Sequence, residues 1–390
     1  MPIVNRLADL ADEITAWRRD IHENPEILYE TVRTAEKVSE LLQSFGVDEI
    51  ATGVGKTGVV GVIKGRNGGA GKTIGLRADM DALPIEEITG KDYASKIPGK
   101  MHACGHDGHT AMLLGAAKYL AETRNFDGTV VVIFQPAEEG GAGAKAMIDD
   151  GLLTRWPIEE VYGMHNFPGM PVGEFAIRKG PIMAATDEFR ITITGRGGHA
   201  AKPHETIDPI VIGSQLVSAL QTIASRNANP LDSVVVSVTV FQGGNAFNVI
   251  PQEVLLRGTV RTLSPEMRDL AQARMESIVS SVGDAFGAKA VLQFTRGYPV
   301  TANHDEQTDF AAAVAEGIAG VGKVNREIEP MMGGEDFSYM LEERPGAFIF
   351  AGNGDSAGLH HPAYDFNDDL IPVGCSYWVK LVETALPAAA

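Results

Sequence analysis

The sequence predicts an α/β protein in which a smaller α+β domain is inserted into a larger domain with a mostly parallel sheet. Two observations predict this architecture. Short apolar runs of strand length alternate with helical stretches along most of the chain, which is typical of parallel strands covered on both faces. Residues 185–298 instead follow the order strand, helix, strand, strand, helix, strand, which is the ferredoxin-like βαββαβ pattern.

The elements of the larger domain are predicted by apolar periodicity and by the residues that interrupt it. An amphipathic helix begins near Leu7 and ends before Pro25, and a second helix covers residues 31–45. Five apolar runs then predict strands, at residues 58–63, 73–78, 129–134, 161–164 and 347–350. A further amphipathic helix, over residues 109–123, lies between the second and third of these runs.

The inserted domain is predicted to cover residues 185–298, with boundaries in loops that contain glycine and proline. Its elements are strand 188–194, helix 209–226, strands 233–242 and 253–262, helix 265–286 and strand 290–298. The larger domain then consists of residues 1–184 and 299–390. The apolar strand at 233–242 resembles a sheet edge that needs cover, so we expect a homodimer or higher homo-oligomer through this domain.

The composition argues against several partners and locations. A formal net charge of −18 disfavours nucleic acid and anionic membranes, because both attract patches of Lys and Arg. The amino terminus is charged throughout and lacks the apolar core of a secretory signal, and no apolar run approaches the ~20 residues of a membrane span. Cys104 and Cys375 could form one disulfide, but two cysteines make no framework. We therefore expect a cytoplasmic protein.

The segment from Met101 to His109 concentrates more reactive side chains than any other. It reads Met-His-Ala-Cys-Gly-His-Asp-Gly-His, so that three imidazoles, one thiol and one carboxylate lie close together. Thiolate and imidazole are the ligands that zinc and similar ions prefer. The alternative interpretation is a helix-entry turn that is merely rich in histidine.

Polar side chains follow four of the predicted strands, at the point where each strand ends or soon afterwards. These side chains are Asp79 and Asp81, Glu138 and Glu139, His165, and His360 with His361. In open α/β sheets, ligands bind beyond the carboxyl ends of the strands. We therefore expect these side chains to converge on one edge of the sheet, where the turn at Cys104 and His106 joins them.

The number of potential donors predicts two metal ions. The donors would be Cys104, His106, His165, one of Glu138 and Glu139, and one of His360 and His361. A single catalytic zinc takes about three protein ligands, so this larger set fits a two-metal centre better. One glutamate would bind metal while its neighbour acts as general base for an activated water, although a solvated acidic loop is the alternative for this pair.

Five motifs together resemble the amidohydrolase branch of the M20 metallopeptidases. They are Ala-Cys-Gly-His-Asp-Gly-His, Gln-Pro-Ala-Glu-Glu-Gly, Met-His-Asn-Phe-Pro, Gly-Gly-His-Ala-Ala-Lys-Pro-His and Leu-His-His-Pro-Ala-Tyr-Asp-Phe-Asn-Asp. This branch includes hippurate hydrolases, N-acyl-amino-acid amidohydrolases, auxin-conjugate hydrolases and N-acetyldiaminopimelate deacetylases. The likeness extends from Arg18 to Asp368, which is nearly the whole chain.

The resemblance implies a role for each candidate residue of the larger domain. It implies metal ligation by Cys104, His106, Glu139, His165 and His360. Glu138 would be the general base, and His360 is preferred to His361 because the family's ligand lies two residues before the proline. We expect His102 and His109, which flank the ligands, not to bind metal. Three aspartates, namely Asp79, Asp81 and Asp107, would contact the ligand residues without binding the metal themselves.

The resemblance also implies substrate contacts from the inserted domain. His199 would reach the scissile carbonyl, often across a dimer interface, and stabilise the oxyanion. Asn248 and Arg261 would hold the free carboxylate of the substrate, for which the guanidinium fork is well suited. The alternative interpretations are a histidine that caps a helix and an arginine on the surface of a strand.

The predicted function is metal-dependent hydrolysis of the amide bond of a small N-acyl amino acid, such as an N-acetyl or N-benzoyl derivative. Two divalent ions per subunit are expected, and zinc, manganese, cobalt and nickel all suit this mixture of ligands. A dipeptidase or carboxypeptidase with the same metal centre is the nearer alternative. A metal-binding protein without catalysis is the more distant one.

Overall fold

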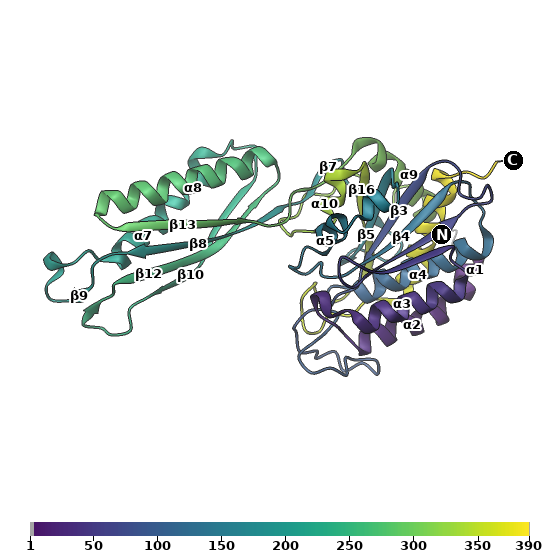
Figure 1. Ribbon diagram of the computed structural model, residues 1–390, viewed down its shortest axis with the longest axis horizontal. Helices are drawn as coiled ribbons and strands as arrows, with labels where there is room; N and C mark the ends of the chain where they lie inside the picture. Colours follow the sequence, from purple (N-terminus) through teal and green to yellow (C-terminus); the bar gives the residue numbers. More distant parts are fainter. Residues whose placement is uncertain (1–3, 390) are drawn as a thin grey trace. The chain divides into compact units, whose positions relative to one another are not determined.

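The computed structural model of the protein describes residues 4–389 and divides them into two compact units (Figure 1). The first unit contains the residues up to Gly180, Ala302–Glu329 and the residues from Asp336 onward, and the second contains Pro181–Thr301 and Pro330–Glu335. The domain limits at 184/185 and 298/299 stay a prediction, because compact units need not fold independently.

The first unit is built on an eight-stranded sheet with the strand order β1-β2-β4-β3-β5-β16-β6-β15. Its strands are β1 (Glu49–Val54), β2 (Gly58–Lys64), β3 (Thr73–Asp79), β4 (Thr129–Gln135), β5 (Glu160–Pro168), β6 (Phe175–Ala176), β15 (Val324–Asn325) and β16 (Gly346–Gly354). The four central strands β4, β3, β5 and β16 are parallel to one another, whereas β1 pairs antiparallel with β2, β2 with β4, and β6 with β16. The prediction of an α/β protein with a mostly parallel sheet is therefore confirmed.

Helices cover this sheet. They are α1 (Asn5–Asp9), α2 (Ala11–Glu23), α3 (Val32–Phe45), α4 (His106–Thr123), α5 (Gly143–Asp149), α6 (Leu152–Arg155), α9 (Asp305–Ala319), α10 (Ser338–Glu343) and α11 (Ile371–Ala385), with 3-10 turns η1 (Leu28–Glu30) and η4 (Asp368–Leu370). Helix α4 contacts β3, α2, α3 and α11, and nearly all its residues are buried. It thus lies in the interior of the unit and gives the site beside it a rigid support.

Two predicted helices differ from the structure in their limits. The helix expected from Leu7 onward is divided at Leu10 into α1 and α2. The helix expected from residue 109 begins three residues earlier, at His106, because Gly105 adopts a left-handed φ of 93° and starts the helix there. His106 consequently lies on the first turn of a buried helix rather than in a loop.

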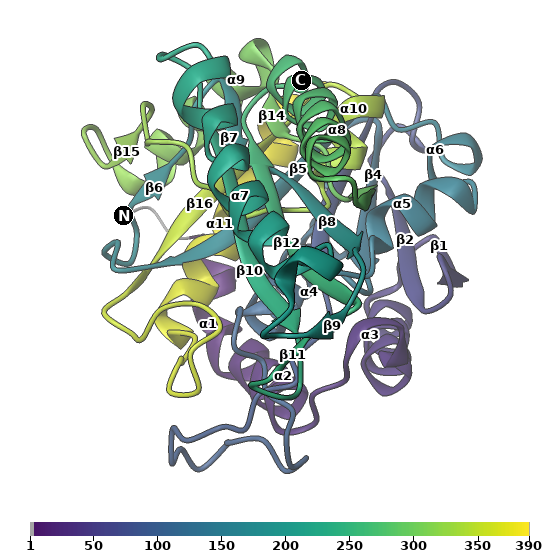
Figure 2. The same cartoon turned by 90° about the vertical axis from the view of Figure 1, so that its left-hand side faces the viewer.

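The second unit is an antiparallel sheet with two helices packed on one face (Figure 2). Its main elements are β8 (Ala185–Thr194), α7 (Pro209–Leu220), β10 (Val234–Gly243), β12 (Glu253–Thr262), α8 (Pro265–Phe286) and β13 (Lys289–Arg296). The sheet order β10-β12-β8-β13 places the first and third strands in the centre, as in a ferredoxin-like fold. Buried and more exposed side chains alternate along β8 and β12. The buried side chains therefore lie on one face of the sheet, where they form the core under the helices.

The remaining elements of the second part of the chain are short. They are the short strands β9 (Gly198–His199) and β11 (Val249–Ile250), which pair antiparallel, the turns η2 (Pro203–Glu205) and η3 (Ile223–Asn227), and strands β7 (Gly180–Met183) and β14 (Thr301–Asn303) at the passages between units. The predicted helix 209–226 thus ends at Leu220 and continues as the π-helical turn η3.

Two sequence expectations about membranes and disulfides can be compared with residues 4–389. In this part of the chain no helix has both the length and the apolar character needed to cross a bilayer. Cys104 and Cys375 are both buried and unpaired, so the single disulfide that the sequence allowed is not formed.

Candidate metal centre

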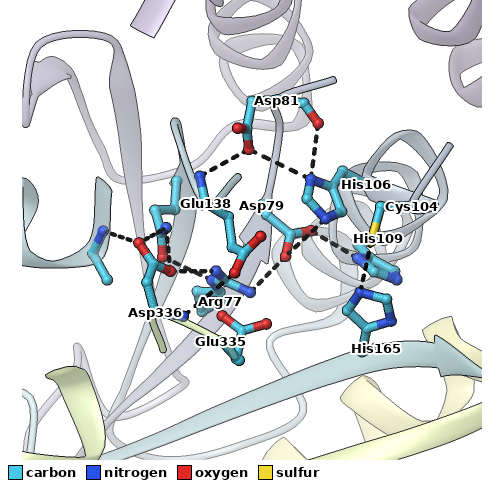
Figure 3. Close-up of polar contacts among 12 residues, drawn as sticks. Arg77, Asp79, Asp81, Cys104, His106, His109, Glu138, His165, Glu335 and Asp336 are labelled. Atoms are coloured by element: carbon cyan, nitrogen blue, oxygen red, sulfur yellow. Dashed lines mark hydrogen bonds and ion pairs between the residues drawn. The ribbon is translucent and has the colours of Figure 1, made fainter. Parts of the chain in front are cut away.

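The carboxyl ends of four adjacent parallel strands bring the candidate residues of the first unit together (Figure 3). Asp79 is the last residue of β3, and Glu138 follows β4 after a short turn. His165 lies near the end of β5, and His360 belongs to the loop after β16. The backbone N–H of His360 donates to the carbonyl of Ala103 (2.8 Å), which joins this loop to the cysteine turn.

The ligand atoms of the five predicted ligands form two groups that share a thiol. Those of Cys104, His106 and His165 lie within 4.8 Å of one another, and so do those of Cys104, Glu139 and His360. Cys104 Sγ lies 3.4 Å from His165 Nε2, and Glu139 Oε1 lies 3.2 Å from His360 Nε2. Two groups with one common thiol are the arrangement expected of two neighbouring ions.

Hydrogen bonds orient the imidazoles toward this centre. His106 Nδ1 donates to the carbonyl of Asp81 (2.8 Å), and His165 Nδ1 donates to the carbonyl of Asn166 (2.7 Å). Each ring therefore presents Nε2 to the centre. His106 Nε2 is buried and has no hydrogen-bond partner among residues 4–389. A buried polar atom without a partner costs about 1–3 kcal/mol, and a bound cation would remove that cost. The residues present therefore fit divalent metal ions.

His109 lies in the same cluster but its two ring nitrogens are occupied. Nδ1 donates to Asp79 Oδ1 (2.7 Å), and Nε2 accepts from the backbone N–H of Asn166 (2.9 Å). The other oxygen of Asp79 accepts from Arg77 Nη1 at 2.6 Å. The hydrogen bonds of His109 and Asp79 within the cluster are compatible with a supporting role, although the ligand atoms of both lie within 4.8 Å of that of His106; their role beside the ligands stays a prediction.

The carboxylate of Asp81 binds the backbone of Glu138 and Glu139. Its two oxygens accept from the backbone N–H groups of Glu138 (2.9 Å) and Glu139 (3.1 Å). Ala137 and Ala142, which flank the pair, both adopt left-handed φ values, of 55° and 54°. Such strain concentrates at functional sites, and here it shapes a tight loop around the two carboxylates. The alternative of a loosely solvated acidic loop does not fit, because Glu138 is buried.

A buried polar network behind the centre was missed in the sequence. Arg77 donates through Nε to Gln135 (2.8 Å) and through Nη2 to Asp336 (3.0 Å), in addition to its bond to Asp79. Gln135 also donates to both oxygens of Asp336. The one available signal was a charged residue, Arg77, inside an otherwise apolar strand.

The substrate-contact candidates all lie in the second unit. His199 belongs to β9, and its Nδ1 accepts from the backbone N–H of Ala201 (3.1 Å), so the proton of the neutral ring lies on Nε2. The backbone N–H of Ala200 donates to the carbonyl of Asn248 (3.0 Å), which brings Asn248 beside His199. Arg261 lies apart from the β9–β11 pair, on β12, where it pairs with Val235 and Thr186.

Comparisons with known proteins assign the chain to a family. The model of peptidase family M20/M25/M40 matches residues 75–384. The chain belongs to the M20 peptidase family. A hippurate hydrolase of Campylobacter jejuni is 43% identical over 381 residues, covering 98% of each chain, and an N-acetylcysteine deacetylase of Bacillus subtilis is 39% identical over 370 residues, covering 95% of this chain and 96% of that protein.

A solved structure gives the same assignment. A Bacillus subtilis protein described as a dinuclear metal binding peptidase of the M20 family superposes with a TM-score of 0.85 at 36% identity, over 98% of this chain and 100% of that one. The predictions of an M20 fold and of a metal-dependent hydrolase of the amidohydrolase branch are therefore confirmed.

The candidate metal centre of this M20 protein is surrounded by acidic side chains. Burial alone would lower the pKa of His106, but the charge of Asp79 and the hydrogen bond to Asp81 raise it to about 10. Burial, together with the charges of Glu139 and Glu138, raises the pKa of the Cys104 thiol well above its ordinary value. The same negative field attracts a divalent cation, which must displace these protons in order to bind.

Metal affinity of this M20 protein is therefore expected to rise with pH between about pH 6 and 8. Cys104 and His106 are both protonated in this range without metal, so each displaced proton contributes about tenfold in affinity per pH unit. Isothermal titration of Zn²⁺ in buffers of different ionisation enthalpy measures the number of protons released. A pH-independent affinity with no proton release would contradict this electrostatic account.

Asp107, the third supporting aspartate, is held by a buried ion pair one residue after His106. Its Oδ2 lies 2.9 Å from Arg18 Nε and 2.8 Å from His22 Nδ1, and all three side chains are fully buried. Although burial raises the pKa of Asp107, the charges of Arg18 and His22 outweigh it and hold this pKa well below the ordinary value. The ion pair thus anchors the first turn of α4 to α2.

Arg18→Met is expected to destabilise the M20 fold by about 3–5 kcal/mol, because it leaves the buried Asp107 carboxylate without its main counter-charge. Chemical denaturation at pH 7 measures this loss. The ion pair stabilises fully above the unfolded-state pKa of about 3.9, and its contribution is lost as the pH falls toward the lower folded-state value.

Arg19→Met is the matched control for this variant. Arg19 pairs with Asp368 at 2.8 Å, but its side chain is 46% exposed, so the expected loss is at most about 1 kcal/mol. Equal losses for Arg18→Met and Arg19→Met would show that the buried pair does not anchor α4.

Proposed function

We propose that the protein hydrolyses the amide bond of small N-acyl amino acids with two divalent metal ions. One observation carries this proposal. Two groups of ligand atoms share Cys104, and a carboxylate oxygen of Glu138 lies within 4.8 Å of the ligand atoms of His106 and Glu139. A basic carboxylate thus stands directly beside the proposed metal ligands, as a hydrolytic centre requires.

The ligands proposed for the ions are Cys104, His106, Glu139, His165 and His360. Divalent ions bound there would polarise the acyl carbonyl and lower the pKa of water. Zinc, manganese, cobalt and nickel all accept thiolate, imidazole and carboxylate together, so the metal is chosen in part by availability.

The chain's own side chains move the proton and bind the substrate. Glu138 takes a proton from the attacking water and gives it to the leaving amine. His199 donates from Nε2 to the carbonyl oxygen as negative charge develops on it, since its Nδ1 is already an acceptor. Asn248 and Arg261 hold the free carboxylate of the amino acid.

The substrate class is supported by the relatives. A hippurate hydrolase, an N-acetylcysteine deacetylase and an IAA-amino acid hydrolase of Arabidopsis thaliana are between 39% and 43% identical to the chain. Each name describes an acyl group attached to an amino acid. A carboxypeptidase is the second candidate, because a thermostable carboxypeptidase of Saccharolobus solfataricus is 41% identical over 388 residues.

A substrate panel separates these two functions. N-acetyl and N-benzoyl amino acids are compared with dipeptides and with N-blocked peptides, after metal removal and restoration of Zn²⁺, Mn²⁺, Co²⁺ or Ni²⁺ in turn. The highest kcat/KM is expected for an N-acyl amino acid. Faster turnover of peptides with every metal would reject the N-acyl amino acid assignment in favour of the peptidase.

We also propose a homodimer through the second unit and a cytoplasmic location. Strand β10 lies at the edge of its sheet, with Val235 and Phe241 exposed by 38% and 42%. An apolar edge strand is an unpaired template that a second copy can cover. The unpaired cysteines agree with a reducing compartment. Light scattering tests the dimer, and a Val235→Lys variant should then be monomeric.

A further inference from the structure

Asn166 is a completely buried side chain whose polar groups are all used within the metal centre. Its side-chain Nδ2 donates to the carbonyl of Cys104 (2.6 Å), and its Oδ1 accepts from the hydroxyl of Tyr364 (2.7 Å). Its backbone N–H donates to His109 Nε2 (2.9 Å), and its carbonyl accepts from His165 Nδ1 (2.7 Å). From its place on β5, Asn166 therefore contacts the cysteine turn, α4 and the loop after β16.

The two side-chain bonds determine the orientation of the Asn166 amide. The carbonyl of Cys104 only accepts, so Nδ2 must face the cysteine turn, and Oδ1 consequently faces the hydroxyl of Tyr364. Tyr364 is itself fully buried and comes four residues after His360. The tyrosine thus links the loop that carries one proposed ligand to the strand and turn that carry two others.

The packing around Asn166 leaves no space for a side chain at Gly105. A Cβ atom on Gly105 would lie 2.2 Å from Asn166 Nδ2 and 2.6 Å from the Tyr364 hydroxyl. Gly105 also has a left-handed φ of 93°. The glycine between the proposed ligands Cys104 and His106 is therefore required by the close approach of the Asn166 amide.

We infer that Asn166 and Tyr364 are positioning residues that set the distance between Cys104 Sγ and His165 Nε2, and with it the metal affinity of the centre. Asn166 holds Cys104 through its carbonyl and His165 through the ring nitrogen opposite Nε2, so a shift of Asn166 moves both ligand atoms. This inference rests on the proposed function, since it concerns the same metal centre. Partners that orient metal ligands typically contribute 10–100-fold in affinity.

Tyr364→Phe and Asn166→Asp test this inference. Tyr364→Phe removes one hydrogen bond and leaves the phenyl ring in place. Asn166→Asp places a carboxylate oxygen against the carbonyl of Cys104, where two acceptors repel each other, so its effect is expected to be larger. If the aspartate variant does not fold, Tyr364→Phe alone still tests the inference.

Tyr162→Phe is the matched control. Tyr162 is also a buried tyrosine of the first unit and lies on β5, where its hydroxyl donates to Glu160 at 2.8 Å. The control variant thus loses a hydrogen bond of the same kind without touching the metal centre. The thermal stability of the metal-free protein is expected to fall for both phenylalanine variants.

The readouts are Co²⁺ affinity by competition with a chelator, the thiolate-to-cobalt absorption band, and kcat separately from KM. Tyr364→Phe is expected to weaken Co²⁺ binding about 10–100-fold, to reduce the thiolate band and to lower kcat more than it changes KM. Tyr162→Phe should bind Co²⁺ like the wild type. Equal Co²⁺ affinity and spectra in the two variants and the wild type would overturn the inference alone. A wild-type protein that binds no Co²⁺ would overturn the proposed function and this inference with it.

Discussion

Glu138→Gln is expected to lower kcat for N-acyl amino acid hydrolysis by about 10³-fold, within the usual range for loss of a general base. Glutamine has nearly the same shape but cannot take up a proton from water. The backbone N–H that donates to Asp81 is unchanged, so the loop should keep its conformation. Steady-state kinetics with the preferred N-acyl amino acid, together with metal content by elemental analysis, measures the effect.

The neighbouring glutamate provides the sharpest comparison. Glu139→Gln should mainly weaken metal binding, because Glu139 Oε1 lies 3.2 Å from His360 Nε2 within a ligand group, whereas Glu138→Gln should keep its metal. Glu40→Gln, an exposed substitution on α3, should leave both properties unchanged. Full activity of Glu138→Gln would reject the general-base role. Wild-type protein that binds metal but hydrolyses nothing on the panel would favour the non-catalytic alternative.

The position of the site was predictable because parallel strands leave a clear pattern in a sequence. The buried strands β3, β4 and β5 are continuous apolar runs, and the first polar side chains after them stand at the carboxyl edge. The strand order β4-β3-β5-β16 then brings Asp81, Glu139, His165 and His360 to one edge, although their separation in the chain is large.

The features that were missed depend on local geometry or on long-range contacts. Half of the residues of strand β1 are exposed and the strand lacks an apolar run, and β6 and β15 contain two residues each, which is too short for any periodicity. The roles of Asn166 and Tyr364 are invisible in sequence because their bond joins residues 198 positions apart. Likewise, the start of α4 at His106 depends on the left-handed conformation of Gly105, which composition alone does not reveal.

His199→Ala is expected to lower kcat by about 10²–10³-fold with little change in KM, because a single oxyanion donor contributes about that much in other hydrolases. The side chain is exposed in the second unit and belongs to none of the candidate metal-ligand groups found in residues 4–389. Metal content should therefore stay at the wild-type value. Kinetics with the preferred N-acyl amino acid and elemental analysis of the same sample test both statements.

A rescue experiment distinguishes a hydrogen-bond donor from a merely structural residue at this position. His199→Gln retains an N–H donor and should recover part of the lost kcat, whereas His199→Phe keeps a planar ring without a donor and should not. His204→Ala is the matched control, because its side chain is 76% exposed and lies five residues further along the chain, in turn η2. If His199→Ala kept wild-type kcat, the oxyanion would have to be stabilised without this histidine. Loss of kcat with equal activities for the glutamine and phenylalanine variants would instead assign His199 a packing role beside the β9–β11 pair.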